Sequence, residues 1–310
     1  MTELLNLSGR VVVVTGAGRG LGRAYSVAFA QRGASVVVND VSREHADETV
    51  EAITREGGSA VASYDSVSTT AGAGAIVGTA ERTFGRLDSL VNNAGFMRNG
   101  YFETITPERL SDVLDVHIKG TYFVTQAAWP LLRACGNGRV VMTSSAGGLF
   151  AMRGESNYAA AKAAIYGLCK ALAIEGGDHG IAVNAVLPKA ATTISAGDPV
   201  PDHAAHYPAG LREAFAPLQH AESVAPLVLY LASEECTVNG EAFAAGLGRY
   251  ARVFVGETPG WSAKDPLAVE PEDIAARLQE IRNVEGFCIP ADIYDELSFI
   301  AGLIGVATAS

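Results

Sequence analysis

The sequence has little positive charge, which limits the partners to be expected. Of its 310 residues, 23 are Lys or Arg and 34 are Asp or Glu, so the formal net charge is −11. Nucleic acids and anionic membranes are bound through basic surfaces. We therefore expect neither a nucleic acid nor a membrane as a partner. A small anionic ligand remains possible, because it needs only a few basic residues in one place.

Cysteine and long apolar runs are also scarce. The four cysteines are scattered, with no C-x-x-C pair and no Cys/His cluster at metal-ligand spacing. This pattern predicts buried free thiols in a reducing compartment and no metal site. The longest apolar run, residues 224–232, is too short to span a membrane and contains Pro226. With no signal-peptide pattern at the amino terminus, these features predict a cytoplasmic protein.

The chain is otherwise rich in apolar residues and glycine. Hydrophobic residues make up 48% of it and charged residues only 18%, which excludes a disordered chain and provides for a large core. Its 34 glycines follow no G-X-Y repeat, so a collagen-like structure is excluded.

Residues 1–249 alternate short β-branched runs with amphipathic helical patterns. The runs are apolar throughout, as in parallel strands that are buried on both faces, and crossover helices separate them. The pattern predicts an α/β Rossmann-type fold, a doubly wound parallel sheet of about seven strands. Thr106 and Pro107 open one long helix that we expect to end near Ala134. The expected strands are Val11–Val14, Ser35–Asn39, Ala60–Tyr64, Ser89–Val91, Arg139–Thr143, Ile181–Leu187 and Ala242–Ala245.

Residues 250–310 have a different pattern. They contain four prolines, a capped helical pattern at 270–283 and an apolar stretch at 297–306. The stretch is too apolar for a loose tail. We expect a C-terminal, mostly helical extension that packs on the 1–249 domain or on a partner subunit.

A glycine-rich loop lies between the first expected strand and the first helix. Its pattern, T-G-x-x-x-G-x-G, places Gly16, Gly20 and Gly22 where the backbone must turn tightly. Such loops bring helix amides close to a pyrophosphate. A tight turn without a ligand is the alternative interpretation.

An acidic residue ends the second expected strand. Asp40 follows Gly22 by 18 residues, near the spacing of the acid that binds the adenosine ribose. A carboxylate there favours NAD, because it would repel the 2′-phosphate of NADP. Arg19 in the loop favours NADP instead, since it could pair with that phosphate. An ordinary helix N-cap is the alternative role for Asp40.

Three further residues have the chemistry of a proton-transfer site. Tyr158 and Lys162 are four residues apart in a helical pattern and share one face. Ser145 follows the fifth strand, at the edge of the sheet where such folds bind ligands. A tyrosine with a pKa of about 10 is a weak acid or base at neutral pH, and a nearby ammonium lowers that pKa. A Tyr/Lys pair alone is more often ordinary helix surface.

Taken together, these motifs resemble the short-chain dehydrogenase/reductase family over about residues 7–248. The resemblance rests on the glycine loop, N-N-A-G at 92–95, the interval from Ser145 to Tyr158, and Y-x-x-x-K. It implies that Tyr158 is the general acid/base, that Lys162 holds the nicotinamide ribose, and that Ser145 orients the substrate oxygen. The cofactor-binding residues it implies are Gly16, Arg19, Gly20, Leu21, Gly22, Asp40, Asp65, Ser66, Asn92, Ala94, Gly95, Tyr158, Lys162 and Thr193.

The chain departs from the family at two positions. The family's fourth catalytic residue is an Asn, and the matching position holds His117, which we expect in a proton-relay or water-holding role. A structural histidine is the alternative. If the relay role holds, His117→Asn keeps activity and moves its pH profile. The usual Pro-Gly after the sixth strand is Pro188-Lys189, which alters the loop near the nicotinamide.

Several stretches are similar to one subgroup, the (3R)-hydroxyacyl-CoA dehydrogenase unit of peroxisomal multifunctional enzymes of type 2. They are residues 38–40, 115–120, 142–145 and 224–230, together with the extension. The resemblance implies NAD-dependent oxidation of a fatty or steroid side-chain 3-hydroxyacyl-CoA. It also implies a homodimer, with a tetramer possible. By their position near the expected mouth of the site, the candidate CoA-phosphate ligands are Arg98, Arg153, Lys189 and Arg212; for each, an ordinary solvated surface charge is the alternative.

Two alternatives stay open. One is a hydroxysteroid or other secondary-alcohol dehydrogenase, because this fold changes substrates through its loops. The other is an NAD-binding sensor or scaffold without catalysis. An intact set of Ser145, Tyr158 and Lys162 disfavours the second, and unchanged biological output of a Tyr158→Phe variant would favour it.

Overall fold

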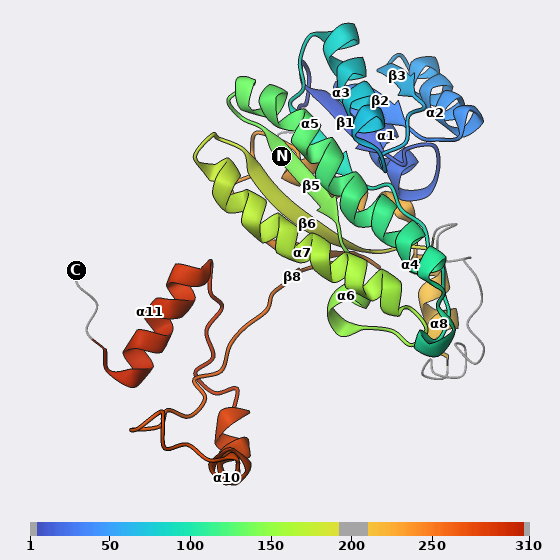
Figure 1. The fold of residues 1–310 in the computed structure, drawn as a ribbon. Helices are drawn as coiled ribbons and strands as arrows, with labels where there is room; N and C mark the ends of the chain where they lie inside the picture. The colour runs from blue at the N-terminus through green and yellow to red at the C-terminus, as the bar shows by residue number, and fades with distance from the viewer. Residues whose placement is uncertain (1–4, 192–209, 307–310) are drawn as a thin grey trace. The chain divides into compact units, whose positions relative to one another are not determined.

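A sheet of eight strands forms the centre of the molecule. A computed structural model describes residues 5–191 and 210–306, and its strand order is β3-β2-β1-β4-β5-β6-β7-β8 (Figure 1). The pairs from β3 to β7 are all parallel. The predicted doubly wound fold is confirmed, with eight strands where about seven were expected. The strands are β1 (Val11–Thr15), β2 (Ser35–Asn39), β3 (Ser59–Ser63), β4 (Ser89–Asn92), β5 (Arg139–Thr143), β6 (Ala182–Lys189), β7 (Ala242–Gly246) and β8 (Arg249–Val253).

The eighth strand comes from residues that the sequence pattern assigned to the extension. β7 and β8 are joined by Leu247 and Gly248, whose φ angles are 57° and 71°. Two residues with positive φ make the tight turn that suits a hairpin. Leucine rarely adopts this conformation, so the sequence gives little sign of the turn.

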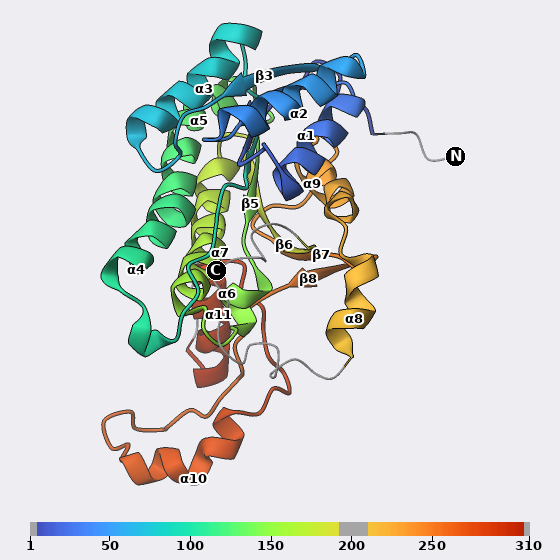
Figure 2. The same ribbon diagram turned by 90° about the vertical axis from the view of Figure 1, so that its right-hand side faces the viewer.

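Helices cover both faces of the sheet. α3 (Thr70–Phe84), α5 (Thr121–Ala134) and α7 (Ser156–Gly177) lie on one face, and α1 (Gly20–Gln31), α2 (Arg43–Arg55) and α9 (Ala225–Leu231) lie on the other (Figure 2). The sheet order reverses between β1 and β4. In open α/β sheets, ligands bind at the carboxyl ends of the strands beside this reversal.

The long helix expected from Thr106 to Ala134 is divided. α4 (Pro107–Leu114) passes into a π-helical segment, η2 (Asp115–Gly120), before α5 begins. Single π turns inside α-helices are often found at functional sites. Here the segment carries His117, which is buried. The apolar pattern on either side is helical, so it does not reveal the wider turn.

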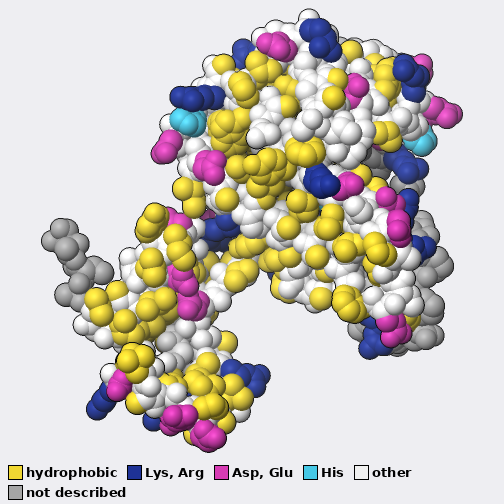
Figure 3. Space-filling model, in the orientation of Figure 1, with side chains coloured by type: hydrophobic (Ala, Val, Ile, Leu, Met, Phe, Trp, Pro, Cys, Tyr) yellow, Lys and Arg dark blue, Asp and Glu magenta, His cyan; other side chains and the backbone are white. Residues whose placement is uncertain are grey.

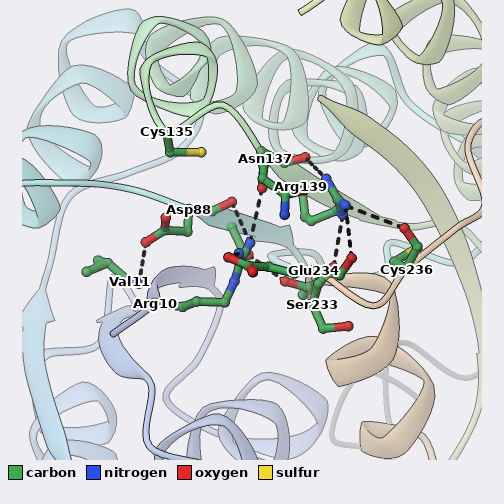
Figure 4. Close-up of polar contacts among 12 residues, drawn as sticks. Arg10, Val11, Asp88, Cys135, Asn137, Arg139, Ser233, Glu234 and Cys236 are labelled. Carbon is green, nitrogen blue, oxygen red and sulfur yellow. Dashed lines mark hydrogen bonds and ion pairs between the residues drawn. The ribbon is translucent and has the colours of Figure 1, made fainter. Parts of the chain in front are cut away.

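Two buried arginines join the amino ends of the strands, away from the ligand-binding edge (Figure 4). Arg10 pairs with Glu234 at 2.9 Å and donates to the Ser89 hydroxyl at 3.0 Å. Arg139 donates to the Ser233 carbonyl oxygen at 2.9 Å. These bonds tie β1, β4 and β5 to the segment after α9. Because both guanidinium groups are hydrogen-bonded to several segments of the chain, we assign them a structural role.

The carboxyl-terminal part is a second compact unit. The chain divides into residues 1–252 and 253–310. The second unit holds α10 (Pro271–Ile281) and α11 (Ile293–Ile304), and neither helix has a buried residue. Figure 3 shows apolar side chains spread over the surface of this unit. In the described part of the chain, no helix is both long and apolar enough to cross a membrane.

Candidate active site

The glycine loop between β1 and α1 leaves no room for side chains at two of its positions. Gly16 has a φ of +61°, and a methyl group there would lie 2.7 Å from the Ala94 Cα. A methyl group at Gly22 would overlap the Gly16 carbonyl oxygen. The loop is therefore folded tightly against the end of β4, where Ala94 and Gly95 follow Asn92 and Asn93.

Thr15 and Asn93 hold the loop in this shape. The Thr15 hydroxyl oxygen accepts from the backbone N–H of Asn93 at 3.0 Å and of Ala94 at 3.1 Å. The Asn93 side chain donates to the carbonyl oxygens of Thr15 at 2.9 Å and of Gly16 at 3.0 Å. Asn93 was missing from the expected cofactor residues, although it lies inside the N-N-A-G motif.

Asn92, which was among the expected cofactor ligands, has a different environment. Its side chain is buried and donates to the Thr125 hydroxyl of α5 at 2.8 Å. This bond fixes β4 to α5. Within N-N-A-G, the structure therefore assigns the support of the glycine loop to Asn93.

Asp40 links the end of β2 to the glycine loop. Its Oδ2 accepts from the Gly18 N–H at 3.1 Å, and its Oδ1 accepts from the Ser42 N–H at 2.9 Å. The N-cap of α2 is Ser42 rather than Asp40. Each carboxylate oxygen keeps a lone pair, so Asp40 can still accept from ribose hydroxyls.

The other expected adenosine-site residues lie at the same edge of the sheet. Arg19 is exposed at the N-cap of α1. Asp65 and Ser66 follow β3, and the Asp65 carbonyl oxygen accepts from the Asn39 side chain at 2.9 Å. The Ser66 hydroxyl lies 2.8 Å from that of Ser68. Thr193 lies outside the described residues.

This loop fits a dinucleotide. α1 begins without a side-chain cap and without an acidic residue in its first turn, so its first amides are open to an anion. The absence of side chains at Gly16 and Gly22 lets a pyrophosphate approach the backbone. The adenosine and pyrophosphate ends of the cofactor thus have matching residues.

Ser145, Tyr158 and Lys162 are brought together by α6 (Ala146–Phe150) and α7. Ser145 caps α6, and its hydroxyl accepts from the Gly147 N–H at 3.1 Å. The Lys162 Nζ lies 5.6 Å from the Tyr158 ring centroid and donates to the Thr143 carbonyl oxygen at 2.6 Å. A methyl group at Gly148 would lie 2.7 Å from the Lys162 Cβ, so α6 and α7 are in close contact.

Burial shifts the pKa values of this group. It raises the pKa of Tyr158 to about 12, against the opposing effect of the Ser145 hydroxyl. It also lowers the pKa of Lys162 to about 7. From the sequence, we expected the Lys162 ammonium to lower the pKa of Tyr158. With the Lys162 ammonium bonded to Thr143, desolvation of the phenolate is the larger effect.

His117 of η2 lies beside Tyr158. The two rings meet edge to face, with centroids 5.4 Å apart. The His117 Nε2 lies 2.8 Å from the Phe96 carbonyl oxygen and 3.2 Å from the Phe96 N–H, while its Nδ1 is buried without a partner among the described residues. Burial, together with the charge of Lys162, lowers the pKa of His117 to about 3. The imidazole is therefore neutral at working pH.

The His117 ring leaves no room for a side chain at Gly95. A methyl group at Gly95 would overlap the imidazole ring. Only glycine fits between His117 and the cofactor edge of β4. Gly95 thus leaves the space that the His117 ring occupies.

The expected CoA ligands are only partly described. Arg98, which pairs with Asp112 at 3.8 Å, and Arg153 are exposed, as is Lys189 at the carboxyl end of β6. Nothing is described for the side chain of Arg212. Among the residues that the structure describes, there is no group of three or more His, Cys, Asp or Glu that could hold a metal ion.

Comparison with known proteins agrees with this geometry. The family model described as "short chain dehydrogenase" matches residues 10–201. The chain is 42% identical over 286 residues to the Mycobacterium tuberculosis protein Rv0148, whose name places it among short-chain dehydrogenases/reductases; the match covers 89% of this chain and 95% of that one.

Two other similar proteins are much longer. The mouse peroxisomal multifunctional enzyme type 2 is 45% identical over 258 residues, which are 80% of this chain and 33% of that enzyme. The full-length enzyme of this name from Drosophila melanogaster has a solved structure that matches with a TM-score of 0.78 at 31% identity, over 97% of this chain and 50% of that one. This chain therefore spans a third to a half of those two proteins. The chain belongs to the short-chain dehydrogenase/reductase family of oxidoreductases, which act on a CH–OH group.

Proposed function

We propose that the protein is a cytoplasmic NAD-dependent dehydrogenase that oxidises the 3-hydroxyl group of a (3R)-hydroxyacyl-CoA, fatty or steroid side-chain, to the 3-oxoacyl-CoA. The observation that carries the reaction class is the joint position of Ser145, Tyr158 and Lys162 at the carboxyl edge of the sheet. The substrate class is supported by the 45% identity to the mouse multifunctional enzyme.

In the proposed reaction, Tyr158 exchanges a proton with the substrate oxygen. As the phenolate it takes the hydroxyl proton while the C3–O double bond forms, and in the reverse reaction the phenol returns that proton. NAD, when bound, supplies the acceptor for the hydride that leaves C3. Because burial raises the pKa of Tyr158 to about 12, we expect oxidation to become faster as the pH rises.

Ser145 and Lys162 support that proton transfer. The Ser145 hydroxyl can donate to the substrate oxygen and hold it near Tyr158. Lys162 is buried at the foot of the site and is anchored through Thr143. Its amino group can bind the ribose hydroxyls of the cofactor and, while it is protonated, stabilise negative charge on Tyr158.

The choice of NAD rests on Asp40. The carboxylate stands at the end of β2, where the adenosine ribose is expected, and would repel a 2′-phosphate. Arg19, exposed in the same loop, is the residue through which some use of NADP could remain.

We further propose that residues 253–310 form part of a subunit interface in a homodimer or tetramer. Leu267, Tyr294 and Leu297 of this unit are 95%, 75% and 53% exposed. Apolar exposure on this scale favours burial against another surface, either the 1–252 unit or another chain. A second copy of this chain is the simplest partner.

The substrate proposal is tested by measuring NADH formation from 3-hydroxyacyl-CoA esters of several chain lengths, steroid side-chain CoA esters and free hydroxysteroids. We expect turnover of the (3R) esters and not of the (3S) esters. Activity on free steroids alone would replace the acyl-CoA proposal with the hydroxysteroid alternative. Binding of NAD without turnover of any alcohol would favour the sensor or scaffold alternative.

A further inference from the structure

Glu155 is a largely buried glutamate for which the proposed reaction has no role. It occupies the N-cap position of α7 but makes no capping hydrogen bond with its side chain. The residue is 6% exposed. Among the residues that the structure describes, no group donates a hydrogen bond to its carboxylate. The Glu155 oxygens are not among the fully buried unpartnered atoms, so solvent rather than a protein donor hydrogen-bonds them.

The backbone, rather than the side chain, fixes Glu155 in place. Its carbonyl oxygen accepts from the Ala159 N–H at 2.7 Å, in the first turn of α7. Glu155 also forms a parallel β-bridge with Gly100, whose N–H donates to the Gly154 carbonyl oxygen at 2.9 Å. The carboxylate is thus held at the site by its main chain and is not used as a structural link.

The carboxylate lies beside the two proposed proton-handling groups. A methyl group built on Gly147 would lie 3.5 Å from the Glu155 Oε2, 3.5 Å from the Ser145 Oγ and 3.7 Å from the Tyr158 Cε1. All three side chains therefore surround one small space on α6. Glu155, at the N-cap of α7, precedes Tyr158 by three residues.

Most other charged groups near this end of α7 are paired or neutral, and Arg153 is exposed to solvent. The Lys162 ammonium donates to Thr143, and His117 is neutral. Asp115 and Lys119 pair with each other at 2.7 Å. α6 carries no titratable residue. The titratable side chains around this end of α7 are Glu155 at its N-cap, Tyr158 and Lys162 of α7, Arg153 just before it, Arg98 and Tyr101 of the segment that bridges to Glu155 through Gly100, His117, Asp115 and Lys119 of η2, and Glu108, Arg109 and Asp112 of α4.

We propose that Glu155 is a positioning residue that sets the pH at which Tyr158 exchanges its proton, through the negative charge that it places beside Ser145 and Tyr158. This inference rests on the proposed role of Tyr158 as the acid/base. The negative charge of Glu155 raises the pKa of Tyr158, in addition to the larger effect of burial. Burial raises the pKa of Glu155 itself, so it becomes neutral at a higher pH than an ordinary glutamate does.

The test uses titration of the Tyr158 phenol, which does not depend on turnover. The absorbance change on tyrosine ionisation is recorded against pH for the full chain and for its Tyr158→Phe variant, and the difference reports Tyr158 alone. The measurement is repeated in the Glu155→Gln background. We expect the Tyr158 midpoint to fall by on the order of one pH unit, because a like charge has been removed.

Two variants serve as controls. Glu155→Asp keeps the charge and is expected to titrate close to the wild-type chain. Glu175→Gln makes the same substitution at an exposed position near the other end of α7 and should leave the midpoint unchanged. A Glu155→Gln midpoint equal to that of the wild-type chain would overturn the proposal.

The pH profile of NADH formation provides a second readout. In Glu155→Gln, the rising limb of kcat/KM for oxidation should move to lower pH by the same amount. If the phenol midpoint shifts but no 3-hydroxyacyl-CoA is oxidised, the inference about Glu155 holds and the substrate proposal fails. If oxidation occurs but neither the midpoint nor the limb moves, the inference about Glu155 fails alone.

Discussion

At the residue scale, burial fixes the protonation states in the site. It raises the pKa of Tyr158 to about 12, lowers that of Lys162 to about 7 and lowers that of His117 to about 3. At neutral pH the phenol is therefore protonated and the imidazole is uncharged. His117 can accept or donate a hydrogen bond there, but it does not carry a proton as a cation.

His117 should make folding stability depend on pH in acid. Its pKa is about 3 when folded and about 6.5 when unfolded, so the unfolded chain binds more protons between those values. Stability from this group is complete above about pH 6.5 and is lost as the pH falls toward 3, by up to about 1.4 kcal/mol per pH unit. Denaturant unfolding at several pH values measures the slope. His117→Asn should flatten it, and an equal slope in both proteins would contradict a buried neutral histidine.

Asp40 should control the choice between NAD and NADP. Removing its carboxylate in Asp40→Ala removes the repulsion of a 2′-phosphate, so kcat/KM with NADP should rise relative to NAD by on the order of tenfold, about 1.4 kcal/mol. Glu51→Ala, at an exposed position on α2, is the control. An unchanged preference would remove Asp40 from cofactor selection.

At the scale of elements, the glycine loop, α6 and η2 form the site because each lies at a strand's carboxyl end or against α7. Strands and most helices were predictable, since continuous apolar runs and capping residues are local signals. The π turn at Asp115–Gly120 was not, because its extra backbone residue leaves the apolar pattern on either side helical. The hairpin into β8 was missed for a similar reason, as it depends on a positive φ at Leu247.

The site residues also divide into those that local sequence patterns predict and those that they do not. Tyr158, Lys162, Ser145 and the glycine loop have spacings that can be read from the sequence. The burial of Glu155 and the bond from Asn92 to Thr125 depend on how separate segments pack, so no local pattern could reveal them.

Substitution by alanine should be harmful at one helical glycine, Gly22, and stabilising at another, Gly74. Gly22→Ala should abolish NAD binding, because its methyl group would overlap the Gly16 carbonyl oxygen. Gly74→Ala in α3 meets nothing within 4 Å, so it should increase the free energy of unfolding by up to about 1 kcal/mol through better helix propensity. Calorimetry of NAD binding and denaturant unfolding measure both effects. Full NAD affinity in Gly22→Ala would contradict the tight loop.

At the scale of the whole molecule, the chain joins a well-packed sheet unit to a second unit whose helices bury none of their own residues. The first unit holds all the described residues of the proposed reaction. The second unit has large apolar side chains that stay exposed, among them Leu267 and Tyr294, which is why we propose that it contributes to contact between subunits.

This assignment predicts the effect of a charge on α11. Leu297 is 53% exposed, so Leu297→Glu should cost the single chain little stability. In an assembly it would place a charge in an apolar contact and should shift the molecular mass toward the monomer. Light scattering after size-exclusion chromatography measures this. Thr54→Glu, at an exposed position on α2, is the control, and an unchanged mass in Leu297→Glu would contradict the assignment of α11 to the interface.

The central claim is that Tyr158 transfers the proton during oxidation of a secondary alcohol by NAD. It is tested most directly by the rate of NADH formation from a (3R)-hydroxyacyl-CoA in the wild-type chain and in Tyr158→Phe, with NADH affinity measured on the same samples. We predict that kcat falls by about 10²- to 10⁴-fold while NADH still binds. An unchanged kcat in Tyr158→Phe would contradict the account.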